Sequence, residues 1–526
     1  MIAGMDEFVP RRWLRGGHRM TLFGWGNPRN FHGLPAAVER TFEINPQTRV
    51  VAHCHWQPEP ARRPTLLALH GLNGSSHSHY MRGIATKAWA RGMNVVRLNQ
   101  RNCGNTEHLS AGLFHSGLTE DARHVVHRSH APMINPPCPA GPAPAPGCQQ
   151  ALHRARALRA QGRSIVALSI GQPDFQTPAH IVEAGMKALK DGHHGYTPAN
   201  GIPEVRQAVA DDLNKRHGIT TVDPNNVLIV PGGKVTMYFA IMMFGEPGAE
   251  IIYPNPGFPI YESTIKFSGA TPVPLPLLEE NGFGFKAEDV LSRITPKTRL
   301  IIVNSPANPT GGIVEKGEID KLVKGLEKHP NVAIMSDEIY SEMLYDGKVH
   351  TSFLKYPQIA DRLIMLDGWS KTYAMTGWRM GYSVWPKSLI EHATRLCINV
   401  HSCVNASAQW AGLAALTGPK DEVAKMMVAF DERRRFTVAE LNKLPGVSCI
   451  TPYGAFYAFP NIKGTGFKSK ALEVALLDEA GVASIAGTSF GSYGEGYLRI
   501  SYANSIENIG EAIKRIGGFL EKRKAA

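Results

Sequence analysis

The sequence predicts an α/β protein whose sheet is mostly parallel, with a smaller α+β part at its C-terminal end. Three short apolar runs, 227–230, 300–303 and 332–335, have the length and composition of buried parallel strands. Each run ends in a turn or in polar residues, and strand and helix patterns alternate in this way to about residue 415. The residues after this point mix helical and antiparallel-strand patterns.

A proline-rich stretch over residues 131–148 separates two parts of different composition. Proline at this density blocks helix and sheet alike and favours an extended spacer. Residues 1–150 hold 15 arginines and one lysine, whereas residues 151–526 hold 17 arginines and 24 lysines. We therefore expect a segment 1–130, a linker 131–148 and a second protein, 149–526, joined to it.

The composition favours a globular protein in a reduced compartment. Hydrophobic residues make up 43% and charged residues 19% of the 526 residues, and no apolar run has the roughly 20 residues of a membrane span. The chain start lacks the basic and apolar regions of a signal peptide, so we expect a cytoplasmic location and no membrane partner. The seven cysteines form no C-x-x-C pair, which indicates neither a zinc site nor a disulfide framework. The scattered arginines show no nucleic-acid-binding motif.

The motif over residues 370–382 predicts a site for pyridoxal phosphate. Lys371 can form a Schiff base with the aldehyde of this cofactor, and the neighbouring Ser370 and Arg379 can together bind its phosphate. Two further motifs follow predicted strands. Asn308 lies in an Asn-Pro-Thr-Gly turn, and Asp337 and Tyr340 follow the next strand. Open α/β sheets bind ligands at such strand ends.

The order of these motifs resembles that of the fold-type I, class I/II aminotransferases of the aspartate aminotransferase superfamily. The resemblance covers residues from about 151 to 526 and begins with the loop 169–178, which is similar to the substrate-side loop of that family. It implies a large domain, about 191–415, with a mixed, mostly parallel seven-stranded sheet. It also implies a small α+β domain made of 149–190 and 416–526.

The resemblance assigns the catalytic roles to Lys371, Asp337 and Tyr340. The lysine matching Lys371 forms the Schiff base and then moves the substrate's α-proton. The aspartate matching Asp337 pairs with the pyridine nitrogen, which keeps the ring protonated so that it can accept the carbanion's charge. The residues matching Asn308 and Tyr340 bind the ring hydroxyl, and these bonds tune the pKa of the lysine adduct.

Further cofactor contacts are implied at the phosphate and at the ring face. The glycine turn before a helix places Gly233 and Lys234 near the phosphate, because backbone N–H groups at a helix start bind anions. Phe258 matches the aromatic residue that lies on the pyridine ring. Tyr196 resembles the tyrosine that reaches the neighbouring subunit's phosphate, which implies a homodimer.

On the substrate side, Arg499 matches the arginine that binds the α-carboxylate in a bidentate fork. Gly171, Asn308 and Lys234 complete the implied substrate-binding set. In one bacterial subgroup the lysine matching Lys234 recognises a distal carboxylate, which favours acidic substrates. Aromatic residues such as Phe258, Tyr261 and Phe175 would equally accept aromatic ones.

We therefore predict an aminotransferase that exchanges an amino group between an L-amino acid and a 2-oxo acid in a ping-pong cycle. A β-lyase or decarboxylase on the same fold is the alternative, because all three begin from the same adduct. Which bond breaks depends on how the substrate is oriented against the ring.

The segment before the linker resembles the N-terminal part of an α/β-hydrolase over residues 20–126. A strand at 65–69 leads into a His70-Gly71 turn of the kind that helps to form an oxyanion hole. The linker begins where the nucleophile strand is expected. The G-x-S-x-G string 487–491 precedes no helix and no later histidine, so it completes no triad.

We interpret this segment as a truncated, catalytically inactive and protease-sensitive hydrolase remnant. Alternatively it is an interaction module fused to an impaired transferase, since a predicted helix at 149–162 displaces the family's N-terminal arm.

Overall fold

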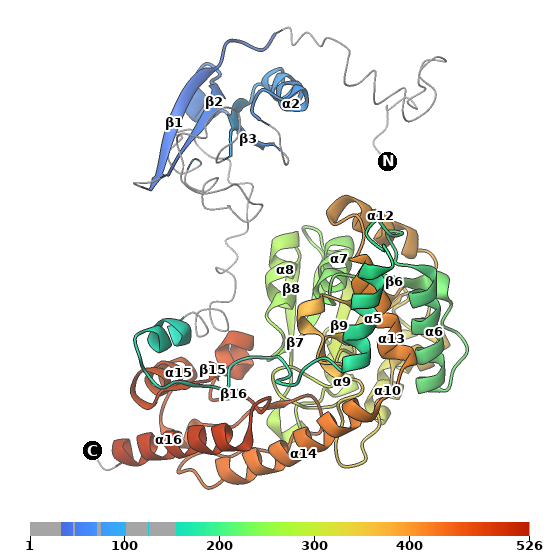
Figure 1. Cartoon of the computed structure of the whole chain (residues 1–526), viewed down its shortest axis with the longest axis vertical. Coiled ribbons are helices and arrows are strands. Elements are labelled where there is room, and N and C mark those ends of the chain that lie inside the picture. Colours follow the sequence, from blue (N-terminus) through green and yellow to red (C-terminus); the bar gives the residue numbers. More distant parts are fainter. Residues whose placement is uncertain (1–32, 46–47, 71–74, 101–124, 126–153, 525–526) are drawn as a thin grey trace. The chain divides into compact units, whose positions relative to one another are not determined.

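The computed structural model describes residues 33–45, 48–70, 75–100, 125 and 154–524 (Figure 1). The chain divides into two compact units, Met1–Cys138 and Pro139–Ala526. The boundary falls inside the stretch 131–148 that we predicted to be a linker, although the stretch itself lies outside the described residues. Within the described ranges, no helix combines the length and the hydrophobicity needed to cross a bilayer.

The first unit contains a four-stranded sheet in the order β1-β2-β4-β3. Its strands are β1 (Val38–Asn45), β2 (Thr48–His55), β3 (Thr65–Leu69) and β4 (Asn94–Leu98), and helix α2 (His79–Trp89) joins β3 to the parallel β4. The strand predicted at 65–69 is therefore present as β3. The hydrolase likeness is not confirmed, and the turn after His70 lies outside the described residues.

The second unit is built on a seven-stranded sheet in the order β6-β12-β11-β10-β9-β7-β8. Strand β12 is antiparallel to both of its neighbours, and the other pairs are parallel. This confirms the predicted mixed, mostly parallel sheet. The strands are β6 (Val227–Val230), β7 (Glu250–Asn255), β8 (Thr271–Pro276), β9 (Thr298–Asn304), β10 (Ala333–Asp337), β11 (Leu363–Asp367) and β12 (Gly381–Val384).

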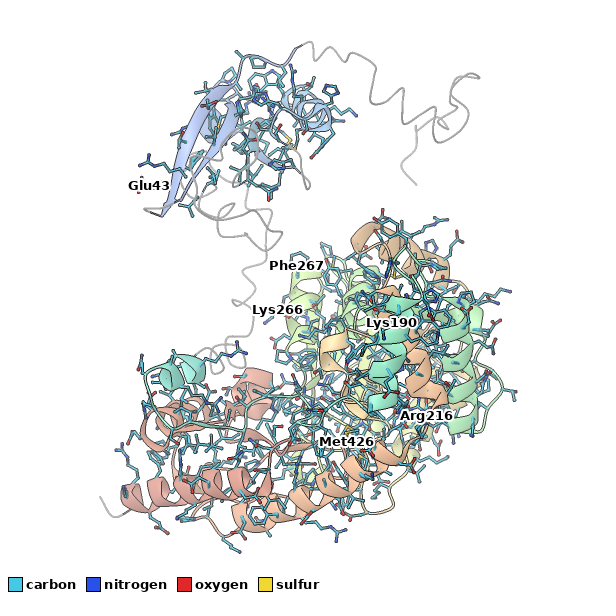
Figure 2. All side chains as sticks on the ribbon, viewed as in Figure 1. Glu43, Lys190, Arg216, Lys266, Phe267 and Met426 are labelled. Carbon is cyan, nitrogen blue, oxygen red and sulfur yellow. The ribbon has the colours of Figure 1, made fainter. Side chains whose placement is uncertain are left out.

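Helices cover both faces of this sheet, as β6 illustrates. Leu228 and Val230 pack into a core with Phe239 and Tyr261, whereas Val227 and Ile229 face a different core on the other side. Side chains fill the space between the helices and the sheet (Figure 2). Phe267 of α8 instead extends outward, and 55% of it is exposed. The covering helices are α5 (Ala179–Lys190), α6 (Pro203–His217), α7 (Lys234–Phe244), α8 (Ile260–Ser268), α9 (Ala287–Leu291), α10 (Lys316–Leu326), α12 (Ile390–Val400) and α13 (Ala406–Thr417).

The position of α5 corrects one expected boundary. We assigned residues 149–190 to the small domain, but α5 packs against α13, and its Ile181 lies in the core beneath the large sheet. An apolar stripe on α5 is compatible with either domain, so only its tertiary partner decides. The boundary is better drawn before Ala179.

The small domain packs short strands on long helices. Strands β13 (Tyr457–Ala458), β16 (Leu498–Ser501) and β15 (Ile485–Ala486) form an antiparallel sheet, and β14 (Val482–Ala483) pairs with β5 (Val166–Ala167). Helices α14 (Asp421–Leu441) and α16 (Ile506–Lys524) lie side by side, and α15 is Ser469–Ala475 (Figure 1). Residues 154–160 are helical; the expected start of this helix at 149 lies outside the described residues.

Candidate active site

A cavity of about 370 Å³ opens at the carboxyl edge of β9, β10 and β11. The strand register explains its position: Asp337 is paired with both Asn304 and Leu366, so the loops after three strands meet there. The cavity is lined by almost every predicted site residue: Gly171, Gly233, Lys234, Phe258, Asn308, Asp337, Tyr340, Ser370, Lys371, Arg379 and Arg499. Tyr196 is the exception, because it is 93% exposed and does not line this cavity.

The amine of Lys371 is held at the centre of this group. Lys371 lies in the short helix α11 (Trp369–Thr372), which directly follows β11, and its Nζ donates a hydrogen bond of 2.5 Å to the carbonyl oxygen of Gly171. Burial, assisted by the cationic Arg499 and Lys234, lowers the pKa of Lys371 to about 7. A substantial fraction of the amine is therefore neutral, and nucleophilic, near pH 7.

Asp337 ends β10 and is fully enclosed. Its carboxylate accepts hydrogen bonds from the hydroxyl of Tyr261 at 2.5 Å and from the backbone N–H of Ile339 at 3.3 Å. Burial raises the pKa of Asp337 to about 7, and the nearby acids Asp367 and Glu338 act in the same direction. A pyridinium nitrogen facing this carboxyl group would favour its ionised form.

Glu338, the next residue, belongs to a different environment. Its carboxylate accepts hydrogen bonds from the hydroxyls of Ser336 at 2.8 Å and Ser352 at 3.1 Å, and pairs with Nε2 of His350 at 2.8 Å. Burial opposes its ionisation, but His350 and these hydrogen bonds lower its pKa to about 2. Glu338 does not line the cavity, so of the two adjacent acids only Asp337 is available to a ligand.

A second group of side chains lies beside Asp337. Arg499 donates hydrogen bonds from Nη1 to the side-chain oxygen of Asn308 at 3.1 Å and from Nη2 to the carbonyl oxygen of Ser169 at 2.6 Å. Its Nε is buried and has no hydrogen-bond partner within the described residues. The hydroxyl of Tyr340 lies 2.8 Å from that of Tyr457.

The opposite end of the cavity is rich in positive charge and backbone N–H groups. Gly232 has φ +93°, a backbone conformation that favours glycine, and Nη2 of Arg379 lies 2.2 Å from the place that a Cβ would take. Helix α7 begins at Lys234, directly after this turn, and Ser370 lies on the same cavity wall. An anion would find a helix start, a hydroxyl and two cations here.

These features together fit pyridoxal phosphate. A largely neutral buried amine, a buried acid and an anion-binding end line one cavity of suitable size, and they match the aldehyde, the ring nitrogen and the phosphate of the cofactor in chemical type.

Comparison with known proteins identifies the family of this chain. The family model "Aminotransferase class I and II" matches residues 163–516. The chain belongs to this family. It is 40% identical to the aspartate aminotransferase of Pyrococcus horikoshii over 362 residues, covering 68% of this chain and 92% of that protein. It is 36% identical to aromatic-amino-acid aminotransferase 2 of Thermococcus litoralis over 368 residues, covering 69% and 94%.

A solved structure supports the same fold. The aspartate aminotransferase of Rhizobium meliloti is 31% identical and superposes with a TM-score of 0.68, covering 71% of this chain and 95% of its own. The protein is thus a pyridoxal phosphate-dependent transaminase acting on amino acids and oxo acids, as the sequence predicted.

Two residues of the site escaped the sequence-based assignment, one behind Asp337 and one in the cavity wall. Tyr261 was predicted only as a contact for aromatic substrates, yet its hydroxyl binds Asp337. Tyr457 was not singled out at all, although it lines the cavity between Gly171 and Tyr340. Each acts through a partner more than 75 residues away in sequence, so no local pattern indicates its role.

The adjacent acids Asp337 and Glu338 should have opposite effects on the stability of the cofactor-free protein. The folded pKa of Asp337, about 7, lies above its unfolded value of about 3.9, so its ionisation costs stability as pH rises from about 4 to 7. Asp337→Asn should therefore raise the free energy of unfolding at pH 8 by up to about 4 kcal/mol and little at pH 4.

Glu338→Gln is the matched control, and urea titrations of both variants at pH 4 and 8 make the comparison. The folded pKa of Glu338, about 2, lies below the unfolded value of about 4.3, so its ionised form stabilises the fold above pH 4. Its replacement should lower stability at pH 8 by about 3 kcal/mol. Equal effects of the two substitutions would contradict these assignments.

Proposed function

We propose that this transaminase exchanges the amino group of a dicarboxylic amino acid with a 2-oxo acid. The single observation that supports this choice is the surplus of positive charge in the cavity. Lys234, Lys371, Arg379 and Arg499 line it together with one carboxylate, that of Asp337. Arg379 suits a phosphate and Arg499 suits an α-carboxylate, and Lys234 is the further cation of the lining that we propose binds a second substrate carboxylate.

The position of Lys234 is compatible with this role. Its Nζ lies 5.2 Å from the ring centroid of Phe258, the residue that we propose stacks on the cofactor. Among the charged groups, it is second only to Arg499 in lowering the pKa of Lys371. It therefore acts electrostatically on the reacting amine. The aspartate aminotransferase of Pyrococcus horikoshii, the relative described above, has a dicarboxylic amino acid in its name.

The remaining residues would then divide the reaction between them. The bound cofactor supplies an electron-accepting ring. Asp337, oriented by Tyr261, holds the proton on the ring nitrogen, and Asn308 and Tyr340 donate hydrogen bonds to the ring oxygen. Arg499 fixes the α-carboxylate, so that the Cα–H bond is presented to Lys371. The amine of Lys371, with its pKa lowered to about 7, takes up and returns that proton at neutral pH.

Substituting Lys234 tests the substrate class. Lys234→Met should lower kcat/KM for aspartate about 10- to 100-fold, because a charge-assisted hydrogen bond is lost, and should change that for phenylalanine less than threefold. Steady-state kinetics with both donors, and cofactor affinity measured by absorbance, make the comparison. Lys371→Ala is the control that should remove turnover with either donor. Equal losses for both donors with weaker cofactor binding would instead place Lys234 at the phosphate.

We also propose that the active form is a homodimer in which Tyr196 binds the partner subunit's phosphate. Its 93% exposure supports this assignment, as does the fact that it does not line the cavity of its own chain. A tyrosine so exposed makes few contacts to hold it in place, and contact with a second subunit would bury its ring.

Tyr196→Phe should therefore weaken cofactor affinity about tenfold, the effect of one hydrogen bond to a charged group, without changing the elution volume in gel filtration. Tyr238→Phe is the matched control, because Tyr238 is also exposed, at 38%, and does not line the cavity. Cofactor affinity that is unchanged in Tyr196→Phe would contradict the proposed contact.

For the first unit we propose a hydrolase-like remnant without catalytic activity. Its β3-α2-β4 arrangement supports the likeness. One hydroxyl there has a triad-like environment: Oγ of Ser76 lies 2.9 Å from Nδ1 of His53, whose Nε2 lies 3.4 Å from Glu39. Ser76 is fully buried, however, so a substrate carbonyl cannot reach it.

The full-length protein should thus hydrolyse p-nitrophenyl esters no faster than a Ser76→Ala variant. A turnover that disappears in this variant would establish a second active site and overturn the proposal.

A further inference from the structure

We propose that Tyr457 is a positioning residue that joins the carboxylate-binding arginine to the phenol beside the cofactor ring. The proposal rests on the roles proposed above for Arg499 and Tyr340. Tyr457 begins β13, is fully buried and lines the same cavity. Its ring and its hydroxyl contact different members of the site, so the two contributions can be tested separately.

The ring of Tyr457 restrains Arg499. The guanidinium carbon lies 4.7 Å from the ring centroid of Tyr457 and 4.9 Å from that of Phe490, so both aromatic rings support the arginine. Tyr457 pairs across the sheet with Ser501, two residues after Arg499 on β16, which places Arg499 and Ser501 on one face. The hydrogen bonds that Arg499 donates to Asn308 and Ser169 then fix its guanidinium for a bidentate contact.

The hydroxyl of Tyr457 lies 2.8 Å from that of Tyr340. Either oxygen can donate in this pair. If Tyr340 donates its proton to the cofactor's ring oxygen, Tyr457 must donate to Tyr340. That second hydrogen bond polarises the phenol of Tyr340 and strengthens its own donation. Tyr457 would therefore tune the ring oxygen without touching it.

The same hydroxyl explains why residue 171 is glycine. A Cβ on Gly171 would lie 2.5 Å from Oη of Tyr457 but 3.5 Å from its Cζ, which is an ordinary contact distance. The backbone of Gly171 does not require glycine, so the restriction is one of space. Nζ of Lys371 donates a hydrogen bond to the carbonyl oxygen of Gly171. The hydroxyl of Tyr457, which packs against Gly171, therefore also helps to position the reactive amine.

Two substitutions in the holoenzyme separate ring from hydroxyl. Tyr457→Phe keeps the ring, so the Kd for succinate, followed by the cofactor's absorbance, should stay within twofold. The midpoint pH of the cofactor's absorption change should rise by about 0.2–0.7. A ring oxygen that accepts a weaker hydrogen bond keeps more negative charge, so it attracts the proton that it shares with the lysine adduct more strongly and a higher pH is needed to remove that proton. Tyr457→Leu should also raise the Kd for succinate about tenfold.

Controls distinguish this proposal from the roles on which it rests. Tyr340→Phe should raise the midpoint more than Tyr457→Phe does, and the double variant should equal Tyr340→Phe. Arg499→Lys should weaken succinate binding. If Tyr340→Phe or Arg499→Lys has no such effect, the role proposed for that residue is wrong, and the proposed link through Tyr457 between Arg499 and Tyr340 is wrong as well. If both respond but Tyr457→Phe leaves the midpoint unchanged, only the link is overturned.

A compensating pair supplies an independent test. Gly171→Ala should displace the tyrosine hydroxyl and raise the midpoint, as Tyr457→Phe does, and should also lower kcat. In Gly171→Ala/Tyr457→Phe the clash is relieved, so kcat should recover to that of Tyr457→Phe alone. A double variant that is no better than Gly171→Ala would show that the hydroxyl does not set this spacing, and would overturn that part of the proposal.

Discussion

The active site depends on the burial of an acid and an amine that both ionise less readily than in water. Asp337 and Lys371 are enclosed at the ends of neighbouring strands, and burial moves the pKa of each to about 7. Neither group meets an opposite charge that fully offsets its desolvation. A cofactor with a protonated ring nitrogen and an aldehyde that condenses with the amine removes both costs. Relief of this desolvation on binding therefore strengthens cofactor affinity and favours the protonated ring nitrogen.

Close approach of the two domains gives the site its shape. Added Cβ atoms at Gly311 and Gly454 would lie 2.4 Å from Cβ of Pro452 and of Pro306, respectively, and each of these contacts joins the two domains. An isolated β-bridge between Leu344 and Gly454 joins the loop after β10 to the small domain. Substrate-binding and cofactor-binding side chains come from both sides of this contact. The spacing of backbone segments, more than any single hydrogen bond, therefore sets where Arg499 and Tyr340 lie.

Much of this arrangement could be predicted from sequence because its signals are local. The strands before Asn308 and Asp337 are apolar runs that end in polar residues, and a parallel sheet necessarily gathers such ends at one edge. Tyr457 and Tyr261 could not be assigned in this way, since their roles arise from pairings across the fold. The boundary at α5 was wrong for the same reason: amphipathic periodicity identifies a buried face but not the partner that buries it.

Each unit of the chain contains a hydrophobic core among its described residues. Phe42, Val50 and Val96 pack together in the first unit, while the residues that line the cavity lie between Ser169 and Arg499 in the second. Each unit therefore has its own source of hydrophobic stabilisation. The chemistry of the second unit follows from residues that the second unit itself supplies.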